Sequence, residues 1–130
     1  MSKRRFLGRL HSISHQKNIE VQVNIIEYKD EGIGYSYSPA LDLIGYGSTQ
    51  HEAGKSWEVV LEEYFKYTVN KKTLTKDLRN RGWIVRKGSK QFKPPALSWL
   101  LQNNNDLKEM YNKYDLQKTS KPIKVPLAYT

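Results

Sequence analysis

Cysteine is absent from the 130-residue sequence. Disulfide bonds, thiolate zinc sites and thiol nucleophiles are therefore excluded, and a reducing compartment is favoured. Long apolar runs are absent as well, because none approaches the roughly 18 residues of a membrane span. No hydrophobic signal-peptide core follows the basic start. We therefore expect a soluble, cytoplasmic protein with no membrane partner.

Acidic side chains are scarce in the second half of the chain. Residues 71–130 carry 14 Lys and Arg against 4 Asp and Glu, whereas residues 1–70 carry 8 against 9. This asymmetry favours a polyanionic partner for the second half, either DNA or RNA. The alternative is a Lys-rich surface that only keeps the protein soluble. The residues expected to bind nucleic acid are Lys71, Lys72, Lys76, Arg79, Arg81, Arg86, Lys87 and Lys90.

The first half combines strand-like and helix-like patterns. Residues 19–28 alternate between apolar and polar positions, which predicts a half-buried strand, and shorter strands are expected at 35–38 and 43–47. From Thr49 onward the apolar residues follow helical spacing, and Glu52 stands three residues later, as in a capping box. These patterns predict an α+β fold in which a small antiparallel sheet of about three strands packs on one long helix.

The second half predicts a basic helix-hairpin-helix extension. A helix at 71–81 is stopped by Gly82, a hairpin follows at 83–92, and further helices lie between Pro95 and Tyr114. Asp106 is expected to cap the last of these helices.

An edge strand is predicted at 123–127, because Pro126 cannot donate to a ladder. The chain thus divides into a flexible basic tail at 1–18, a sheet-and-helix domain at 19–70, and a basic extension at 71–130 packed on or beside that domain.

Candidate catalytic groups are few. No nucleophile–base pair and no phosphate-binding loop is visible. His11 and His15 lie one helical turn apart but lack a third metal ligand. Asp30, Asp42 and Glu52 would have to converge to hold a metal, and acids in turns usually serve the turn itself. We therefore expect no catalytic residue, no metal and no cofactor.

One linear pattern runs through residues 19–68. It consists of two early strands, a strand end with proline, a Gly-rich strand and a Thr-x-x-Glu-Ala helix start. The residues that carry it are Tyr35-Ser36-Tyr37-Ser38-Pro39-Ala40-Leu41, Gly45-Tyr46-Gly47-Ser48-Thr49, Glu52-Ala53, Ser56 and Leu61. This stretch resembles the HicB family of type II toxin–antitoxin antitoxins. The resemblance implies a partial ribonuclease H-like fold without catalytic carboxylates. It also implies a HicA-type toxin partner, a small messenger-RNA-cleaving enzyme, and repression of the protein's own operon.

The second half departs from the HicB pattern. HicB antitoxins usually end in a helix-turn-helix or ribbon-helix-helix region, and neither is readable here. Residues 79–92 are instead similar to a stretch of HicA toxins, although a generic basic hairpin would give the same pattern. The catalytic histidine of the toxins follows a Gly-Ser pair, here Gly88-Ser89, and its position is taken by Lys90. A permanent cation cannot replace a general acid and base of near-neutral pKa, so RNA cleavage by this route is not expected.

Together these observations predict a non-catalytic HicB-like binding protein of antitoxin type. It would bind a small toxin through its first half and nucleic acid through its second, as a homodimer. One alternative is a stand-alone nucleic-acid-binding module in which Trp83 stacks on a base, against the competing interpretation that Trp83 belongs to the core. The other alternative is a metal-dependent nuclease that uses Asp30, Asp42 and Glu52.

Overall fold

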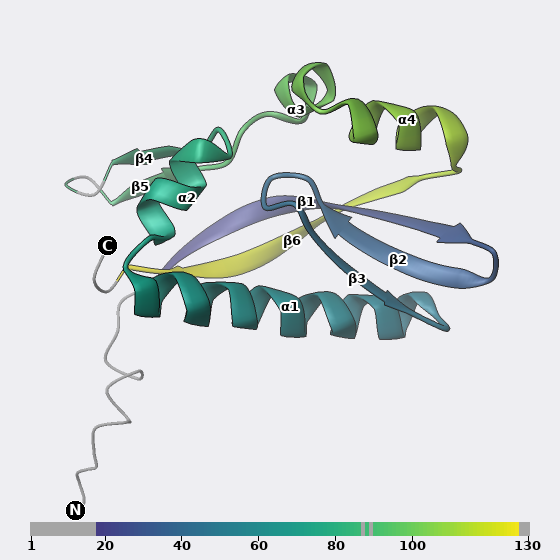
Figure 1. The fold of residues 1–130 in the computed structure, drawn as a ribbon, viewed down its shortest axis with the longest axis horizontal. Coiled ribbons are helices and arrows are strands. Elements are labelled where there is room, and N and C mark those ends of the chain that lie inside the picture. The colour runs from purple at the N-terminus through teal and green to yellow at the C-terminus, as the bar shows by residue number, and fades with distance from the viewer. Residues whose placement is uncertain (1–17, 87, 89, 128–130) are drawn as a thin grey trace, which may run out of the picture.

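The structure is a computed structural model that describes residues 18–86, 88 and 90–127 (Figure 1). The predicted tail therefore lies, except for Asn18, outside the described residues. The main sheet has the strand order β3-β2-β1-β6. Its strands are β1 (Asn18–Asp30), β2 (Ile33–Ser38), β3 (Leu43–Gly47) and β6 (Gln117–Pro126). A separate hairpin consists of β4 (Ile84–Arg86) and β5 (Gln91–Lys93). The helices are α1 (Gln50–Lys71), α2 (Leu74–Asn80), α3 (Leu97–Asn103) and α4 (Asn105–Lys113).

The α+β class is confirmed, but the expected three-stranded sheet is wrong, because β6 adds a fourth strand. β6 pairs antiparallel with β1 along ten residues, from Glu27 opposite Gln117 to Asn18 opposite Pro126. It begins six residues before the predicted strand at 123–127. The first half of β6 carries mainly exposed polar side chains, so the apolar alternation that marks a strand appears only from Ile123 onward.

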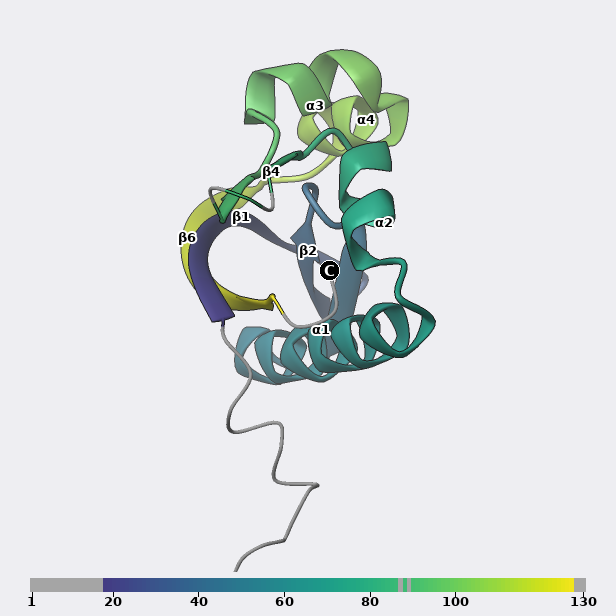
Figure 2. The same ribbon diagram turned by 90° about the vertical axis from the view of Figure 1, so that its left-hand side faces the viewer.

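Helix α1 lies across one face of the sheet, and α3 and α4 lie on the other side (Figures 1 and 2). Its predicted start is confirmed: the hydroxyl of Thr49 accepts a hydrogen bond from the backbone N–H of Glu52 at 3.1 Å. The Glu52 carboxylate in turn accepts from the backbone N–H of Ser48 at 2.9 Å. The helix packs tightly on β3, because a Cβ on Gly45 would lie 2.2 Å from the backbone nitrogen of Trp57.

The second half shares the core of the first. Gly82, with a φ of 95°, ends the turn after α2 as predicted. Trp83 is 3% exposed and donates its indole N–H to the carbonyl oxygen of Ala40 at 2.8 Å. The core interpretation of Trp83 is therefore confirmed, and its ring is not available to stack on a base. Leu74 and Leu78 of α2 belong to the same buried cluster.

The predicted cap of the last helix is wrong. Asn104, not Asp106, is the N-cap of α4, and its side-chain oxygen accepts from the backbone N–H of Leu107 at 3.1 Å. Asp106 lies in the first turn instead, where its carboxylate faces the positive end of the helix dipole. Within the part of the chain that the structure describes, no helix is long and apolar enough to cross a membrane.

Candidate functional site

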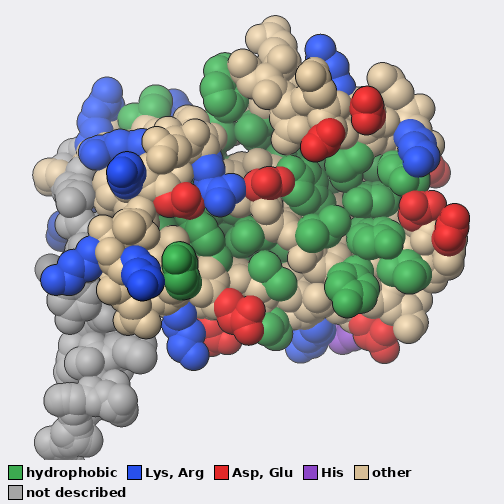
Figure 3. Space-filling model, viewed as in Figure 1, with side chains coloured by type: hydrophobic (Ala, Val, Ile, Leu, Met, Phe, Trp, Pro, Cys, Tyr) green, Lys and Arg blue, Asp and Glu red, His purple; other side chains and the backbone are tan. Residues whose placement is uncertain are grey.

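The residues predicted to bind nucleic acid lie on three neighbouring elements. Lys and Arg side chains gather over α2, the β4–β5 hairpin and the end of α1, on the left of Figure 3. We call this region the basic end. Its exposed members are Lys71, Lys72, Lys76, Arg79, Arg86 and Lys90. Lys87 lies outside the described residues.

Two of the predicted arginines make hydrogen bonds to other parts of the chain. Arg79 donates from its guanidinium to the carbonyl oxygen of Val85 at 2.8 Å. Arg81 donates to the carboxylate of Asp77 at 2.8 Å and to the carbonyl oxygen of Leu41 at 2.7 Å. Both guanidinium groups therefore help to hold the second half in place; Arg79 is nevertheless exposed, whereas Arg81 is half-buried.

Asp77 joins α2 to α1, because its carboxylate accepts hydrogen bonds from the Tyr64 hydroxyl and from Arg81. Burial alone would raise the pKa of Asp77, but these two hydrogen bonds and the charge of Arg81 outweigh it, so the pKa lies below its ordinary value. Burial, followed by the bond to Asp77, raises the pKa of Tyr64. The carboxylate therefore stays ionised and the phenol stays protonated.

Sequence reasoning missed an exposed tryptophan next to the basic end. Trp99 of α3 is 45% exposed, and its ring lies against Gly82, where a Cβ would come within 2.8 Å of it. A cavity of about 350 Å³ opens beside the ring, and its lining includes Arg81 together with the carboxylates of Asp42 and Asp106. Trp99 is thus one exposed aromatic side chain near the basic end, and Tyr67, near the end of α1, is another.

A row of four tyrosines crosses the face of the sheet opposite α1. We call Tyr28, Tyr35, Tyr46 and Tyr114 the tyrosine row. The strand register places Tyr35 between Tyr28 and Tyr46. Ring centroids are 5.0 Å apart for Tyr28 and Tyr35, 6.4 Å for Tyr35 and Tyr46, and 4.9 Å for Tyr28 and Tyr114. Such offset rings form a continuous aromatic surface.

Three carboxylates lie near this aromatic surface. Asp30 accepts from the Tyr114 hydroxyl at 2.9 Å, and Asp42 accepts from the Tyr37 hydroxyl at 2.7 Å. Burial, the bond to Asp42 and the charges of Asp42 and Asp106 raise the pKa of Tyr37. We call Asp30, Asp42 and Asp106 the acidic rim. Figure 3 shows the hydrophobic side chains of this face with acidic ones along the margin.

The structure does not bring together the three candidate metal ligands. Asp30 pairs with Ile33 at the start of β2, whereas Asp42 follows the end of that strand. Both carboxylates accept tyrosine hydrogen bonds, and Glu52 caps α1. Among the described residues no three His, Asp or Glu side chains could hold a metal ion together. His11 and His15 lie outside these residues.

Part of the tyrosine row was visible in the sequence. Tyr35 and Tyr37 are two positions apart on a predicted strand, which places their side chains on the same face of it. Tyr46 joins them only through the strand register, and Tyr114 lies 84 positions from its partner Asp30. No local sequence pattern indicates a contact between residues so far apart in the sequence.

Comparisons of the chain with family models, with curated proteins and with solved structures found no match. The resemblance of residues 19–68 to HicB antitoxins therefore stays a prediction from the sequence.

Proposed function

We propose that this protein is a non-catalytic binding protein of HicB-like antitoxin type. In this proposal the tyrosine row and its acidic rim bind a small, basic, RNA-cleaving toxin, and the basic end binds nucleic acid. The observation that carries the proposal is the separation of two surfaces of opposite character, one aromatic and acidic and the other basic (Figure 3).

The tyrosine row has the composition of a protein-binding surface. Tyrosine offers a large contact area at a low cost in conformational entropy, and aromatic side chains are enriched at interfaces. Tyr46 is 64% exposed, and Ile44 on the same face is also exposed. An arginine of a basic partner would stack on these rings, and its charge would be complementary to the acidic rim.

The basic end suits a polyanion. The ammonium groups of Lys72, Lys76 and Lys90 have no ion-pair partner among the described residues. Exposed cations that neutralise phosphates release counterions from DNA or RNA, which drives binding without base recognition. Trp99, which lies against Gly82 after α2, would supply a stacking surface for an unpaired base.

The proposed binding of a toxin is tested with a HicA-type protein encoded by the neighbouring gene. The catalytic histidine of this toxin is replaced, so that it can be produced without cleaving RNA. Calorimetric titration of the two proteins should show a saturable complex. Tyr46→Ala should weaken it at least about tenfold, which corresponds to about 1.4 kcal/mol. Tyr67→Ala is the matched control, because Tyr67 is also 64% exposed but lies on α1. Equal losses for both variants, or no complex with any such toxin, would overturn the proposal.

A stand-alone nucleic-acid-binding module is the second candidate, and the exposed Trp99 on α3, next to Gly82, favours it. It predicts salt-sensitive binding to nucleic acid and no toxin complex.

We expect a homodimer under either proposal, and light scattering would measure it. The edge of β3 is partly occupied, because the backbone N–H of Tyr46 donates to the hydroxyl of Ser56 on α1 at 3.3 Å.

A further inference from the structure

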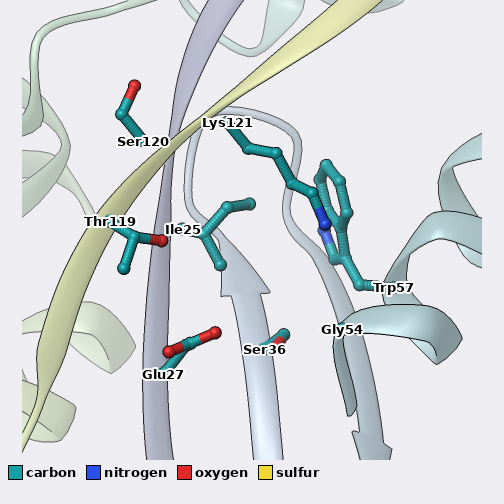
Figure 4. Close-up of a pocket in the computed structure, with 8 residues that line it drawn as sticks. All are labelled: Ile25, Glu27, Ser36, Gly54, Trp57, Thr119, Ser120 and Lys121. Carbon is teal, nitrogen blue, oxygen red and sulfur yellow. The ribbon is translucent and has the colours of Figure 1, made fainter. Parts of the chain in front are cut away.

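A cavity of about 230 Å³ opens between the sheet and the first half of α1 (Figure 4). It lies on the face of the sheet opposite the tyrosine row, because Ser36 points to the other side of β2 from Tyr35. Neither proposed binding surface uses it. Its lining residues are Ile25, Glu27, Ser36, Gly54, Trp57, Thr119, Ser120 and Lys121.

Ser36 is a buried polar residue without a partner. It is 1% exposed, and its hydroxyl makes no hydrogen bond. Its direct cross-strand partner is Glu27, and Figure 4 shows the two side chains next to each other at one end of the cavity. A buried hydroxyl that is left unpaired costs free energy, and such groups in native proteins call for an explanation.

Gly54, which also lines the cavity, is a second residue that lowers the stability of the fold. It lies inside α1, where glycine is less stable than alanine. A Cβ on Gly54 would meet nothing within 4 Å, unlike a Cβ on Gly45, which would collide with the α1 backbone. Neither packing nor backbone conformation therefore requires Gly54. The absence of a side chain at Gly54 keeps the cavity open.

The charges around the cavity leave one carboxylate unbalanced. The ammonium of Lys121 lies 2.8 Å from the carboxylate of Glu58 and 5.6 Å from the centre of the Trp57 ring. The hydrogen bond from Lys121 lowers the pKa of Glu58, so this pair is mutually neutralised. Glu27 has no ion-pair partner in the part of the chain that the structure describes. An anion would be repelled by it, and a cation would be attracted.

We propose that this cavity binds a guanidinium group. The carboxylate of Glu27 would accept two of its N–H groups, and the hydroxyl of Ser36, once its side chain rotates toward the cavity, would accept a third. The planar, donor-only shape of guanidinium matches two acceptors on adjacent strands better than a point-like ammonium does. The source is either a small free guanidinium compound or an arginine side chain of a peptide.

Titration of the full chain with methylguanidine tests the proposal, followed by ¹H–¹⁵N spectra of the backbone amides of Glu27, Ser36 and Gly54. The expected result is saturable shifts at these amides and at the Trp57 indole. Methylurea, which is similar in shape but uncharged, should give none. An arginine-containing tripeptide separates the two sources. If it binds at least tenfold more tightly than methylguanidine, the site binds an arginine of a peptide. If the two bind equally, the site binds a small guanidinium compound.

Variants show whether these residues form the site. Glu27→Gln should weaken methylguanidine binding at least tenfold, whereas Glu20→Gln, an exposed position on the same strand, should leave it unchanged. Ser36→Ala and Gly54→Ala should weaken binding and yet raise the melting temperature, a combination that a purely structural role does not give. An equal response to methylurea, or unchanged binding in Glu27→Gln, would overturn the proposal, as would a cavity that takes up only water. The probes contain neither toxin nor nucleic acid, so this outcome is independent of the proposed function.

Discussion

Trp83 donates its indole N–H to the carbonyl oxygen of Ala40, a residue 43 positions earlier in the chain, and both residues are buried. The bond connects the basic second half to the loop between β2 and β3. Arg81 donates to the next carbonyl oxygen, that of Leu41. Two adjacent carbonyl groups of one loop thus anchor the segment that carries most of the positive charge.

Trp83→Phe should lower the free energy of unfolding by about 1–3 kcal/mol, because it leaves the carbonyl oxygen of Ala40 buried without a donor. Urea unfolding at pH 7 measures the loss. Trp99→Phe is the control and should change stability by less than about 0.5 kcal/mol, because that ring is half exposed. Similar losses in the two variants would contradict the anchoring role of Trp83.

Asp77→Asn should destabilise the protein at pH 7 by about 1 kcal/mol, a modest loss because the ion pair with Arg81 is partly exposed. The pKa of Asp77 is lowered from 3.8 in the folded state. Its contribution is therefore fully present above pH 3.8 and is lost as the pH falls through the folded pKa.

The difference in unfolding free energy between wild type and Asp77→Asn should accordingly shrink between pH 5 and pH 2. Asp115→Asn, at an exposed position, is the control and should cost little at any pH. A wild-type advantage over Asp77→Asn that persists unchanged at pH 2 would show that the carboxylate charge is not what stabilises this contact.

Gly45→Ala should cost about 3 kcal/mol or more, or prevent folding, because its Cβ would overlap the backbone of α1 at Trp57 and Ala53. Gly54 follows Ala53 in α1, and Gly54→Ala should instead raise the free energy of unfolding by about 0.5–1 kcal/mol. Thermal unfolding of the two variants distinguishes a glycine required for close packing from one that is not. A neutral Gly45→Ala would mean that α1 lies farther from β3 than described.

Replacing Lys72, Lys76 and Lys90 with Gln should weaken binding to a labelled DNA duplex. It should also reduce the slope of log K against log salt by about 0.9 for each lysine that contacts a phosphate. Fluorescence anisotropy at several salt concentrations gives both quantities. The matched control replaces Lys29, Lys108 and Lys118, which lie on β1, α4 and β6, and should leave the slope nearly unchanged. A flat salt response of the wild type would rule out phosphate contacts.

Local features were predictable because they depend on residues close in sequence. The capped start of α1 followed from Thr49 and Glu52, and the end of α2 from Gly82. The burial of Trp83 followed from its place between that glycine and an apolar strand. The cap of α4 was missed because Asn104 and Asp106 are both good capping residues, and only the backbone decides between them.

The candidate surfaces were less predictable because they depend on strand register. The tyrosine row needs Tyr46 opposite Tyr35, and the cavity needs Ser36 opposite Glu27. The charge asymmetry correctly pointed to the second half as the location of a basic surface. It could not distinguish the exposed lysines from Arg81, which forms a partly exposed ion pair with Asp77.

The pairing of β1 with β6 has a consequence for how the protein is made. Strands β2 and β3 and helix α1 emerge from the ribosome soon after β1, whereas β6 follows only after every other described element. Until then one long side of β1 has no partner, and such an open edge is a site for aggregation. Any chain released before residue 117 would keep that edge, so truncated products should be the aggregating species in the cell.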